Sequence, residues 1–471
     1  MHKNQIKTIS ITRRDLLKYA FYGTFAGGLS GNFLFGGCVK KKKKPNIFLV
    51  TVDTLRADHL GCYGYHRNTS PNIDAFAKDS LLFENCISHA SDTRLSFASL
   101  LSGFYPHETQ ITKQIQLRHE VDTLPKILQR EGYKTIAVVS NYVLHKGEGW
   151  EKGFDIFDDT MNQQELVRKW PERTAAPTTE HAIELIKQNR ESQLFIWIHY
   201  QDPHGPYTPP GDFSRMFIDS EQKQRHIKLN NSLIGRGGIP AYQQLGKNRN
   251  FHYYVSQYDG EIRYQDQQFK RLLNTLQQLK MYDNSLIIFS SDHGEGMGEH
   301  DYFFAHGDSL HNPLIHVPLI IRYGNTLSGR RKDTVQHIDI APTVFNFLGM
   351  PPKPDFRGHD LRQPYSEKRE IFSEMSSPLV PDRYKFSLIL YPLKLIYTPF
   401  YQKYELYDLH ADPLEKQNLY HKPQYRKHAE DLQTRLHHLR QEDFLQIGSG
   451  KKRIKLSKEE IEKLKSLGYV Q

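Results

Sequence analysis

Continuous apolar, β-rich runs recur along the chain, and helical patterns separate them. The runs cover 46–52 (NIFLVTV), 134–140, 194–200, 285–291 and 317–323. Their apolar residues are consecutive rather than alternating, which is typical of strands buried on both faces. Helical patterns lie between them at 122–132, 178–190 and 261–280. This alternation predicts an α/β fold with a large, mainly parallel sheet sandwiched by helices.

The pattern changes after about residue 365. Two stretches, FSLILYPLKLIYTP (386–399) and YELYDL (404–409), have the character of short antiparallel strands, and a polar helix follows at about 423–442. We therefore predict a catalytic domain over 45–365 and a smaller domain of antiparallel sheet plus helix over 366–471. Residues 210–250 lack periodicity, and we interpret them as an insertion on the substrate side.

Residues capable of chemistry follow four of the predicted strands: Asp53, Asn141, Asp202 with His204, and Asp292 with His293. The carboxyl ends of parallel strands meet at one edge of a sheet, where open α/β folds place their ligands. Four such coincidences indicate an active site at that edge.

Two carboxylates and one imidazole in this group form a plausible ligand set for a divalent cation: Asp53, Asp292 and His293. The surrounding stretch SDHGEGMGEH (291–300) supports it, because its glycines let the backbone approach a ligand closely. Glu295 and Glu299 add negative charge there. The alternative is that each strand-end Asp only caps a helix.

Thr93 lies in SDTRLSFASLLSG (91–103), where a polar turn runs into a helix. Free N–H groups at a helix start favour an anion. A metal touching the Thr93 hydroxyl would lower its pKa and orient it as a nucleophile, so Thr93 joins the candidate metal set. The alternative is an ordinary helix cap at Asp92 or Thr93.

Two loop histidines, His204 and His306, could bind an anionic oxygen or protonate a leaving group. Asn141 is a further candidate contact to the substrate. A single loop histidine is otherwise commonly a surface residue. Structural roles are expected for His311 and His337.

The charge of the chain is concentrated at its start. The 471 residues carry a net +10, and residues 1–44, with ten Lys/Arg against Asp15, account for +9 of it. The other 427 residues therefore carry about +1. Such a balance does not provide the basic groove of a nucleic-acid-binding protein, so we expect no nucleic-acid partner.

Residues 1–44 resemble a targeting segment. Paired Arg13 and Arg14 precede a mildly apolar, glycine-rich stretch, as in a twin-arginine export signal. Cys38 in LFGGC resembles a lipoprotein cleavage site, and the lysines after it could touch anionic lipid. We expect an exported protein, periplasmic or anchored at the cell envelope through Cys38; a disordered basic tail is the alternative. Only Cys62 and Cys86 remain, so no disulfide framework is expected.

Eight motifs between about 45 and 420 resemble the sulfatase family of the alkaline phosphatase superfamily. They are NIFLVTVDTLRADHLGCYGY, TSPNIDAFAKDSLLFENC, SFASLLSGFYP, HYQDPHGPYTPP, SDHGEGMGEH, HVPLII, HIDIAPTVFNFLGM and YELYDLHADPLEKQNL. The resemblance implies a large α/β domain, a small C-terminal sheet domain and one buried divalent metal ion. That ion is usually calcium in sulfatases, while the histidine here makes Mn, Mg or Zn possible.

The chain departs from the family at the nucleophile. Sulfatases mature a Cys or Ser in a Cys/Ser-x-Pro-x-Arg stretch to formylglycine, whereas Thr93, Leu95 and Phe97 stand at those positions here. Thr54 also follows Asp53 where a second acid is usual. A metal-bound Thr resembles the nucleophile of phosphodiesterases and phosphotransferases in the same superfamily.

The sequence therefore predicts an exported, metal-dependent hydrolase of sulfate or phosphate esters, carried on a small molecule, a glycan or a lipid head group. Thr93 is the candidate nucleophile. One alternative is a phosphotransferase that passes a head group to an alcohol. Another is a catalytically inactive relative that binds anionic ligands, and the last is a glycan-binding module without metal. The sequence does not predict an oligomeric state.

Overall fold

The computed structural model describes residues 44–109, 121–351, 353, 355–364, 369–375 and 383–440. The expected export segment, apart from Lys44, and the candidate lipidation site Cys38 lie outside these residues. Export and anchoring therefore stay predictions. Within the described ranges, none of the helices combines the length and the apolar character needed to cross a membrane.

The centre of the fold is an eight-stranded sheet with the order β12-β2-β11-β8-β1-β7-β3-β4. Its strands are β1 (Asn46–Val52), β2 (Leu81–Ile87), β3 (Lys134–Val138), β4 (Ile156–Asp158), β7 (Leu194–Tyr200), β8 (Ser285–Ser291), β11 (His316–Tyr323) and β12 (Gly329–Gln336). Only β11 runs antiparallel to its neighbours β8 and β2, while all other pairs are parallel. The predicted mainly parallel sheet is confirmed.

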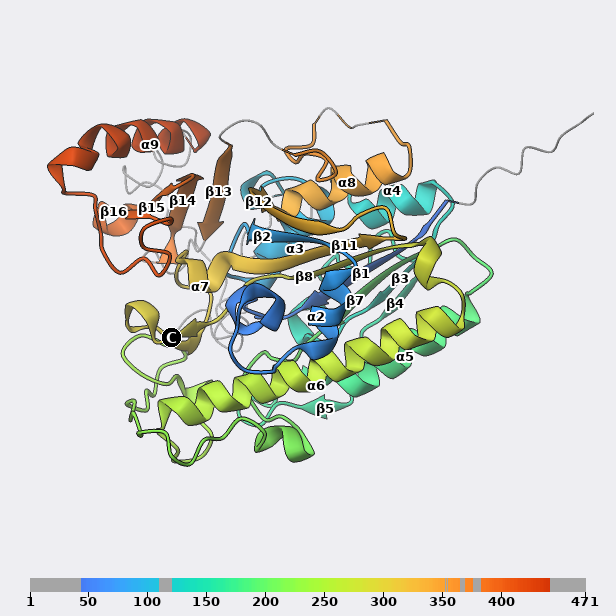
Figure 1. The fold of residues 1–471 in the computed structure, drawn as a ribbon, viewed down its shortest axis with the longest axis horizontal. Helices are drawn as coiled ribbons and strands as arrows, with labels where there is room; N and C mark the ends of the chain where they lie inside the picture. Colours follow the sequence, from blue (N-terminus) through green and yellow to red (C-terminus); the bar gives the residue numbers. More distant parts are fainter. Residues whose placement is uncertain are drawn as a thin grey trace, which may run out of the picture. The chain divides into compact units, whose positions relative to one another are not determined.

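Helices cover both faces of this sheet (Figure 1). One face carries α2 (Pro71–Lys78), α5 (Ala175–Gln188) and α6 (Phe251–Gln278), and the other carries α3 (Thr93–Ser102), α4 (Leu124–Arg130) and α8 (Ile340–Phe347). Alternate residues of β1 point to opposite cores, Ile47 to the core under α3 and Phe48 to the core under α6. Two buried faces explain the continuous apolar runs of the central strands.

A second sheet is antiparallel, with the order β13-β14-β15-β16. It consists of β13 (Glu370–Met375), β14 (Lys385–Leu390), β15 (Leu393–Thr398) and β16 (Lys403–Asp408), and α9 (Arg426–Leu439) packs on it around its own apolar core. The predicted small sheet with a helix is confirmed as an architecture. The domain boundary between 365 and 366 stays a prediction.

Short elements complete the described chain. The remaining strands and the one-turn helix are β5 (Gln163–Gln164), β6 (Pro171–Glu172), β9 (Gly296–Met297), β10 (Phe303–Ala305) and α7 (Asn312–Ile315). The 3-10 turns are Ala57–His59, Gly61–Tyr63, Pro106–Thr109, Tyr142–Leu144, Gly211–Ser214, Ala241–Gln243, Tyr282–Asn284, Glu299–Asp301, His337–Asp339, Pro399–Tyr401 and Pro423–Tyr425.

The structure differs from the sequence pattern in the bounds of the predicted helices, and it adds β2, β4 and β12 to the five predicted strands of the sheet. Helix α6 starts at Phe251, ten residues before the predicted start, because the Asn250 side chain caps it by accepting a hydrogen bond from His252 N (3.2 Å). Strand β12 (GRRKDTVQ) was not predicted, because a polar strand at the edge of a sheet has little apolar pattern.

A buried ion pair ties the small sheet to the rest of the fold. Lys394 Nζ on β15 lies 2.6 Å from Glu415 Oε1, and both side chains are fully buried. Asn312 of α7 joins the pair: its Oδ1 accepts from Lys394 Nζ (2.9 Å) and its backbone N–H donates to Glu415 Oε2 (2.6 Å). The charges are thus matched at the contact between β15 and α7, next to the loop that carries His306.

We predict that Lys394→Met lowers the free energy of unfolding by about 3–5 kcal/mol, because it leaves the Glu415 carboxylate buried without its cation. Lys403→Met is the matched control: Lys403 also pairs with a carboxylate, Glu405, but its side chain is 57% exposed, so the loss should stay below about 1 kcal/mol. Urea unfolding of both variants measures the difference. Equal losses would show that the buried pair does not hold the small sheet.

Candidate functional site

The site is built on four neighbouring parallel strands, β8, β1, β7 and β3. Their carboxyl ends lie side by side, so the residues that follow them converge. Asp53 follows β1 and its backbone N–H donates to Tyr200 O at the end of β7 (2.9 Å). Asn141 Nδ2, from the loop after β3, donates to Asp53 Oδ2 (2.5 Å). The predicted meeting of strand-end side chains therefore occurs.

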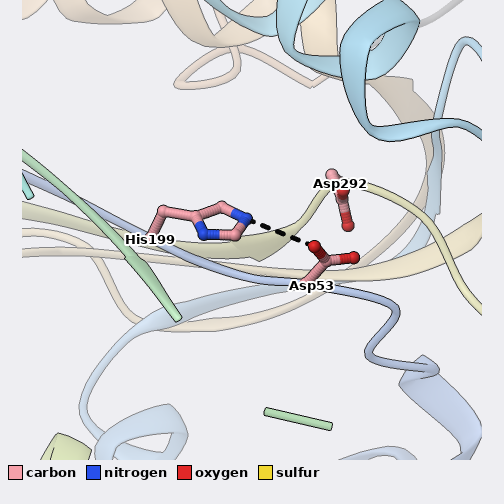
Figure 2. A group of neighbouring side chains, drawn as sticks. All are labelled: Asp53, His199 and Asp292. Atoms are coloured by element: carbon pink, nitrogen blue, oxygen red, sulfur yellow. Dashed lines mark ion pairs between the residues drawn. The ribbon is translucent and has the colours of Figure 1, made fainter. Parts of the chain in front are cut away.

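Asp53, His199 and Asp292 form a compact cluster whose ligand atoms all lie within 4.8 Å of one another (Figure 2). His199 Nε2 is 3.6 Å from Asp53 Oδ2. All three side chains are fully buried. Asp53 Oδ1, Asp292 Oδ2 and both ring nitrogens of His199 have no hydrogen-bond partner among the residues that the structure describes. Buried polar atoms normally have a partner, so these four atoms fit a set of ligands for a bound cation.

The electrostatics of the cluster also call for a cation. Burial, and then the charge of Asp292, raise the pKa of Asp53 well above its usual value. Burial lowers the pKa of His199 to about 3, so its imidazole is neutral and offers a lone pair. Two carboxylates and a neutral imidazole suit a divalent ion, which would offset the repulsion between the acids.

Sequence reasoning missed His199. It lies inside the apolar run LFIWIHY of β7, where a histidine is ordinarily part of the core. Its strand position pairs with Thr51 in β1, two residues before Asp53, which places it on the same side of the sheet edge. Its position near the carboxyl end of a buried strand is the one feature of the sequence that could have indicated a role at the site.

Asp292 and His293 project from the end of β8. Asp292 Oδ1 accepts from Thr54 N (3.1 Å) and His293 N (2.7 Å), which leaves Oδ2 for the cluster. His293 Nδ1 lies 2.9 Å from the Gly294 carbonyl, which only accepts, so Nδ1 donates and Nε2 carries the lone pair. Nε2 is 3.3 Å from Thr93 Oγ1 and 3.5 Å from Asp292 Oδ2.

Thr93 is the first residue of α3 and is not its cap. The Asp92 side chain caps the helix by accepting from Arg94 N (3.1 Å) and Leu95 N (3.3 Å). The Thr93 hydroxyl is thus released from capping, and it faces the lone pair of His293 Nε2. Thr93 is 94% buried, with the remaining 6% open to the cavity that it lines.

The departures from the sulfatase motif fit this environment. Phe97, at the position of the usual Arg, is fully buried, and its ring centroid lies 4.9 Å from that of Trp197 and 5.3 Å from that of His199. Leu95, at the position of the usual Pro, belongs to the core. Phe97 therefore packs on the imidazole of the cluster, in a space where a guanidinium would be buried.

His204 and His306 line the same cavity as Thr93 and Asn141. Burial lowers the pKa of His204 well below its usual value, and Gln201 Nε2 donates to its Nδ1 (3.0 Å), so its Nε2–H is a neutral donor. His306 Nδ1 lies 3.4 Å from Oε1 of the fully buried Glu295. Ring centroids are 5.2 Å apart for His204 and His306, and 4.6 Å for His293 and His306.

Other residues that the sequence singled out lie elsewhere. Glu299 pairs with Arg56 (2.9 Å), and the His300 ring stacks on His311 at 3.6 Å, in a different cavity. His337 Nε2 lies 3.5 Å from Ser290 Oγ inside the core. Asp202 interacts with the side chain of Glu261, and burial raises the pKa of both carboxyls. Asp202 therefore lies outside the cluster.

The outer wall of the cavity comes from two segments that the strand pattern did not connect with the site. The first is the β5–β6 hairpin with Glu165, Arg168, Trp170 and Glu172. The second is the aperiodic segment 210–250, which contributes Leu233 and Tyr242; Arg383 adds to the wall from just before β14. Both segments therefore border the cavity that Thr93 lines.

With this geometry in place, comparisons with known proteins decide the family. A model of the family "Sulfatase" matches residues 45–350, which is more than half of the chain. The chain belongs to the sulfatase family. It is an ester hydrolase of the alkaline phosphatase superfamily, and a model described as "N-sulphoglucosamine sulphohydrolase, C-terminal" matches residues 298–442.

Individual relatives are distant but nearly full-length. An N-acetylglucosamine-6-O-sulfatase of Bacteroides thetaiotaomicron is 22% identical over 484 aligned residues, covering 83% of this chain and 86% of the relative. A structure solved with its substrate D-glucosamine-2-N,6-O-disulfate has a TM-score of 0.70, with 20% identity, 85% of this chain and 98% of that chain covered. The phosphonate monoester hydrolase of Agrobacterium radiobacter has a TM-score of 0.68, with 21% identity over 84% and 95% of the chains. These structures share the fold of this sulfatase.

The Glu172 carboxyl in the cavity generates a prediction about pH. Burial, and then the charges of Asp202 and Glu165, raise its pKa to about 7 from an ordinary value near 4.5. A carboxyl whose pKa is raised on folding stabilises the fold below its unfolded pKa, and this contribution is lost as the pH rises through the folded pKa. Between pH 4.5 and 7, the free energy of unfolding of wild type should therefore fall by about 1–2 kcal/mol relative to that of Glu172→Gln, after allowance for the partial exposure of Glu172.

Urea unfolding of wild type and Glu172→Gln at pH 5 and pH 8 tests this expectation. The difference between the two proteins cancels the other titrating groups. A difference that does not change between the two pH values would show that Glu172 ionises normally in the folded sulfatase.

Proposed function

We propose that this sulfatase is a metal-dependent hydrolase of sulfate or phosphate esters of saccharides, with Thr93 as the nucleophile in place of formylglycine. One observation carries the proposal. The Thr93 hydroxyl, not used as a helix cap, lies 3.3 Å from the lone pair of His293 Nε2, beside a buried cluster of unpartnered metal-type ligand atoms. A nucleophile next to a base and an electrostatic site is the arrangement that covalent ester hydrolysis requires.

Asp53, His199 and Asp292 would hold the cation, and His293 and Thr93 adjoin it. When bound, a divalent cation would supply positive charge to the anionic oxygens of the ester. Calcium is the family's usual ion, but it prefers oxygen ligands only. The His199 imidazole in the cluster favours manganese or zinc, with magnesium a weaker fit to a nitrogen donor.

Thr93 performs the first displacement. His293 Nε2 accepts the Thr93 hydroxyl proton as Oγ1 forms a bond to the sulfur or phosphorus atom, and the bond from that atom to the sugar oxygen breaks. His204 Nε2–H donates to an anionic oxygen of the group being transferred, since its Nδ1 is taken by Gln201. The product of this step is a sulfo- or phospho-threonine ester.

His306 serves the leaving group. The buried Glu295 carboxylate holds its Nδ1, so Nε2 is free to give a proton to the departing sugar oxygen. The same nitrogen, then unprotonated, takes a proton from water in the second displacement. Water adds to the sulfur or phosphorus atom, and the bond to Thr93 Oγ1 breaks, with the proton on His293 returned to it.

The relatives support a saccharide substrate. The curated relatives include the N-acetylglucosamine-6-O-sulfatase and a delta 4,5-hexuronate-2-O-sulfatase of the same bacterium, and one solved neighbour holds a disulfated glucosamine. The cavity beside Thr93 has an aromatic and charged wall, with Trp170, Tyr242 and Arg168, which suits a sugar better than a flexible acyl chain.

We predict that Thr93→Ala lowers kcat/KM at least 10³-fold on the ester that wild type hydrolyses, because it removes the attacking oxygen. Thr93→Ser, which keeps a hydroxyl at the same position, should retain activity within about 30-fold. The measurement is turnover of sulfated and phosphorylated sugars and their aryl esters, with Mn²⁺, Zn²⁺, Mg²⁺ or Ca²⁺.

The outcomes separate the alternatives. Activity that survives Thr93→Ala would contradict a Thr93 nucleophile and indicate direct attack by water. Product formation that requires an added alcohol would indicate a phosphotransferase. Tight ligand binding without turnover, unchanged by Thr93→Ala, would indicate a binding protein without catalysis.

A second prediction separates the cation ligands from the base. His199→Gln and Asp292→Asn should lower the bound metal of the purified protein at least fivefold, whereas His293→Gln should keep most of the metal and lose turnover. Metal content after dialysis, measured by mass spectrometry, gives the result. Loss of metal in His293→Gln would make His293 a ligand and would require another proton acceptor for Thr93.

We also propose that the protein is exported, to the periplasm or the cell envelope. The paired Arg13 and Arg14 before an apolar stretch support export, and Cys38 supports anchoring. Fractionation of cells that express wild type, Arg13→Lys/Arg14→Lys or Cys38→Ser tests both parts. Export that is unaffected by the arginine changes would contradict the twin-arginine route.

A further inference from the structure

The β5–β6 hairpin is hydrogen-bonded to the loop that carries Asn141, next to the buried cluster. Gln163 pairs with Glu172 and Gln164 with Pro171, and a backbone bridge joins Glu172 to Asn141, whose side chain holds Asp53. A hydrogen bond from Glu165 N to Trp170 O (2.9 Å) closes the turn. The hairpin therefore presents its side chains at a fixed position beside Thr93.

Arg168, in the turn of this hairpin, is held by a carboxylate and two aromatic rings. Its Nε and Nη2 donate to the two carboxylate oxygens of Glu165, at 2.6 and 2.7 Å. Its guanidinium carbon lies 4.2 Å from the ring centroid of Trp170 and 4.4 Å from that of Tyr242, so two aromatic rings hold it. Such a guanidinium is pre-organised and loses little conformational freedom on binding a ligand.

One end of this guanidinium is unused. Arg168 Nη1 has no hydrogen-bond partner in the part of the chain that the structure describes, and the side chain is 17% exposed, on the wall of the cavity that Thr93, His204 and His306 also line. The paired N–H donors at that end suit an oxygen of a carboxylate or a sulfate.

The rest of this wall is also favourable to an anion. Arg383 lines the cavity with a side chain that is 11% exposed. Its Nε lies 3.8 Å from Asp308 Oδ1, and Asp308 also pairs with Arg236 and Lys385, so cations outnumber this carboxylate. Among the acids there, Glu165 is paired with Arg168, Asp92 caps α3, and Glu172 has a raised pKa, so it is largely uncharged below pH 7.

We propose that Arg168 is a specificity-determining residue that binds a second acidic group on the sugar, so that the preferred substrates are esters of acidic saccharides. The inference rests on the proposed function, because it assigns the leaving-group side of the same cavity. The shared chemistry is an anionic group beside the ester, either the carboxylate of a uronic acid or a further sulfate.

Matched substrate pairs test this inference at pH 6.5. The first pairs are methyl glucuronides esterified at O2, O3 or O4 and the carboxyl-reduced methyl glucosides with the same ester. The second pairs are di-O-sulfated and mono-O-sulfated methyl glucosides. The readout is the ratio of kcat/KM within each pair. Wild type should favour the more acidic member at least 10-fold in one kind of pair, which also identifies the acidic group.

Arg168→Gln should lower that ratio to below 3, and Arg168→Lys, which keeps the charge without the planar fork, should give an intermediate ratio. Arg426→Gln is the control: Arg426 also pairs with a carboxylate, Glu430, but on the exposed face of α9, and its ratio should equal that of wild type. Circular dichroism confirms that each variant is folded.

A wild-type ratio below 3 in every pair, with good turnover, would overturn the role of Arg168 and leave the proposed function standing. A high ratio that Arg168→Gln does not change would overturn it as well. If wild type hydrolyses none of the esters, the proposed function fails, and titration calorimetry with the same pairs then decides. Equal affinities within each pair would overturn the inference, whereas a preference lost in Arg168→Gln would support it.

Discussion

Two carboxylates, Asp53 and Asp292, are held away from water at the ends of neighbouring strands, and the organisation of the site depends on how their charge is compensated. Within the described residues, neither backbone nor side chains supply enough donors: Asn141 satisfies one oxygen of Asp53, and backbone N–H groups satisfy one of Asp292. The remaining oxygens face a neutral imidazole, His199, rather than a cationic side chain. A cation between these groups would offset the electrostatic cost of burying them, and because the three side chains are fully buried, its charge would act in a medium of low dielectric constant.

The replacement of the formylglycine motif makes sense around this cluster. Formylglycine needs the maturation motif, and Leu95 and Phe97 remove it. In return Phe97 packs against His199, and Asp92 takes the capping role, which leaves the Thr93 hydroxyl facing His293. Phe97 is thereby connected to the cluster, because its ring packs against the His199 imidazole. The proposed Thr93 nucleophile would require no such modification.

The outer wall of the cavity and the buried cluster have different structural origins. The cluster lies at strand ends, whereas the wall comes from a hairpin and the aperiodic segment 210–250, which meet at Arg168 and Tyr242. Rigid placement suits bond-making groups, which tolerate little displacement, while loop segments can vary with the substrate. The ion pair of Glu165 with Arg168 and the two aromatic rings hold the guanidinium in this part of the wall.

The sequence by itself determined the sheet class, most of the central strands and the side chains at their ends, because buried parallel strands leave an unmistakable apolar pattern. It also identified candidate site residues: Asp53, Thr93, Asn141, His204, Asp292, His293 and His306. Only the tertiary structure decided that His199 belongs with the acids, since a histidine within an apolar run has no distinguishing local pattern. The same holds for the meeting of Arg168 with Tyr242. Those facts depend on contacts between residues far apart in the chain, and no local periodicity encodes such contacts.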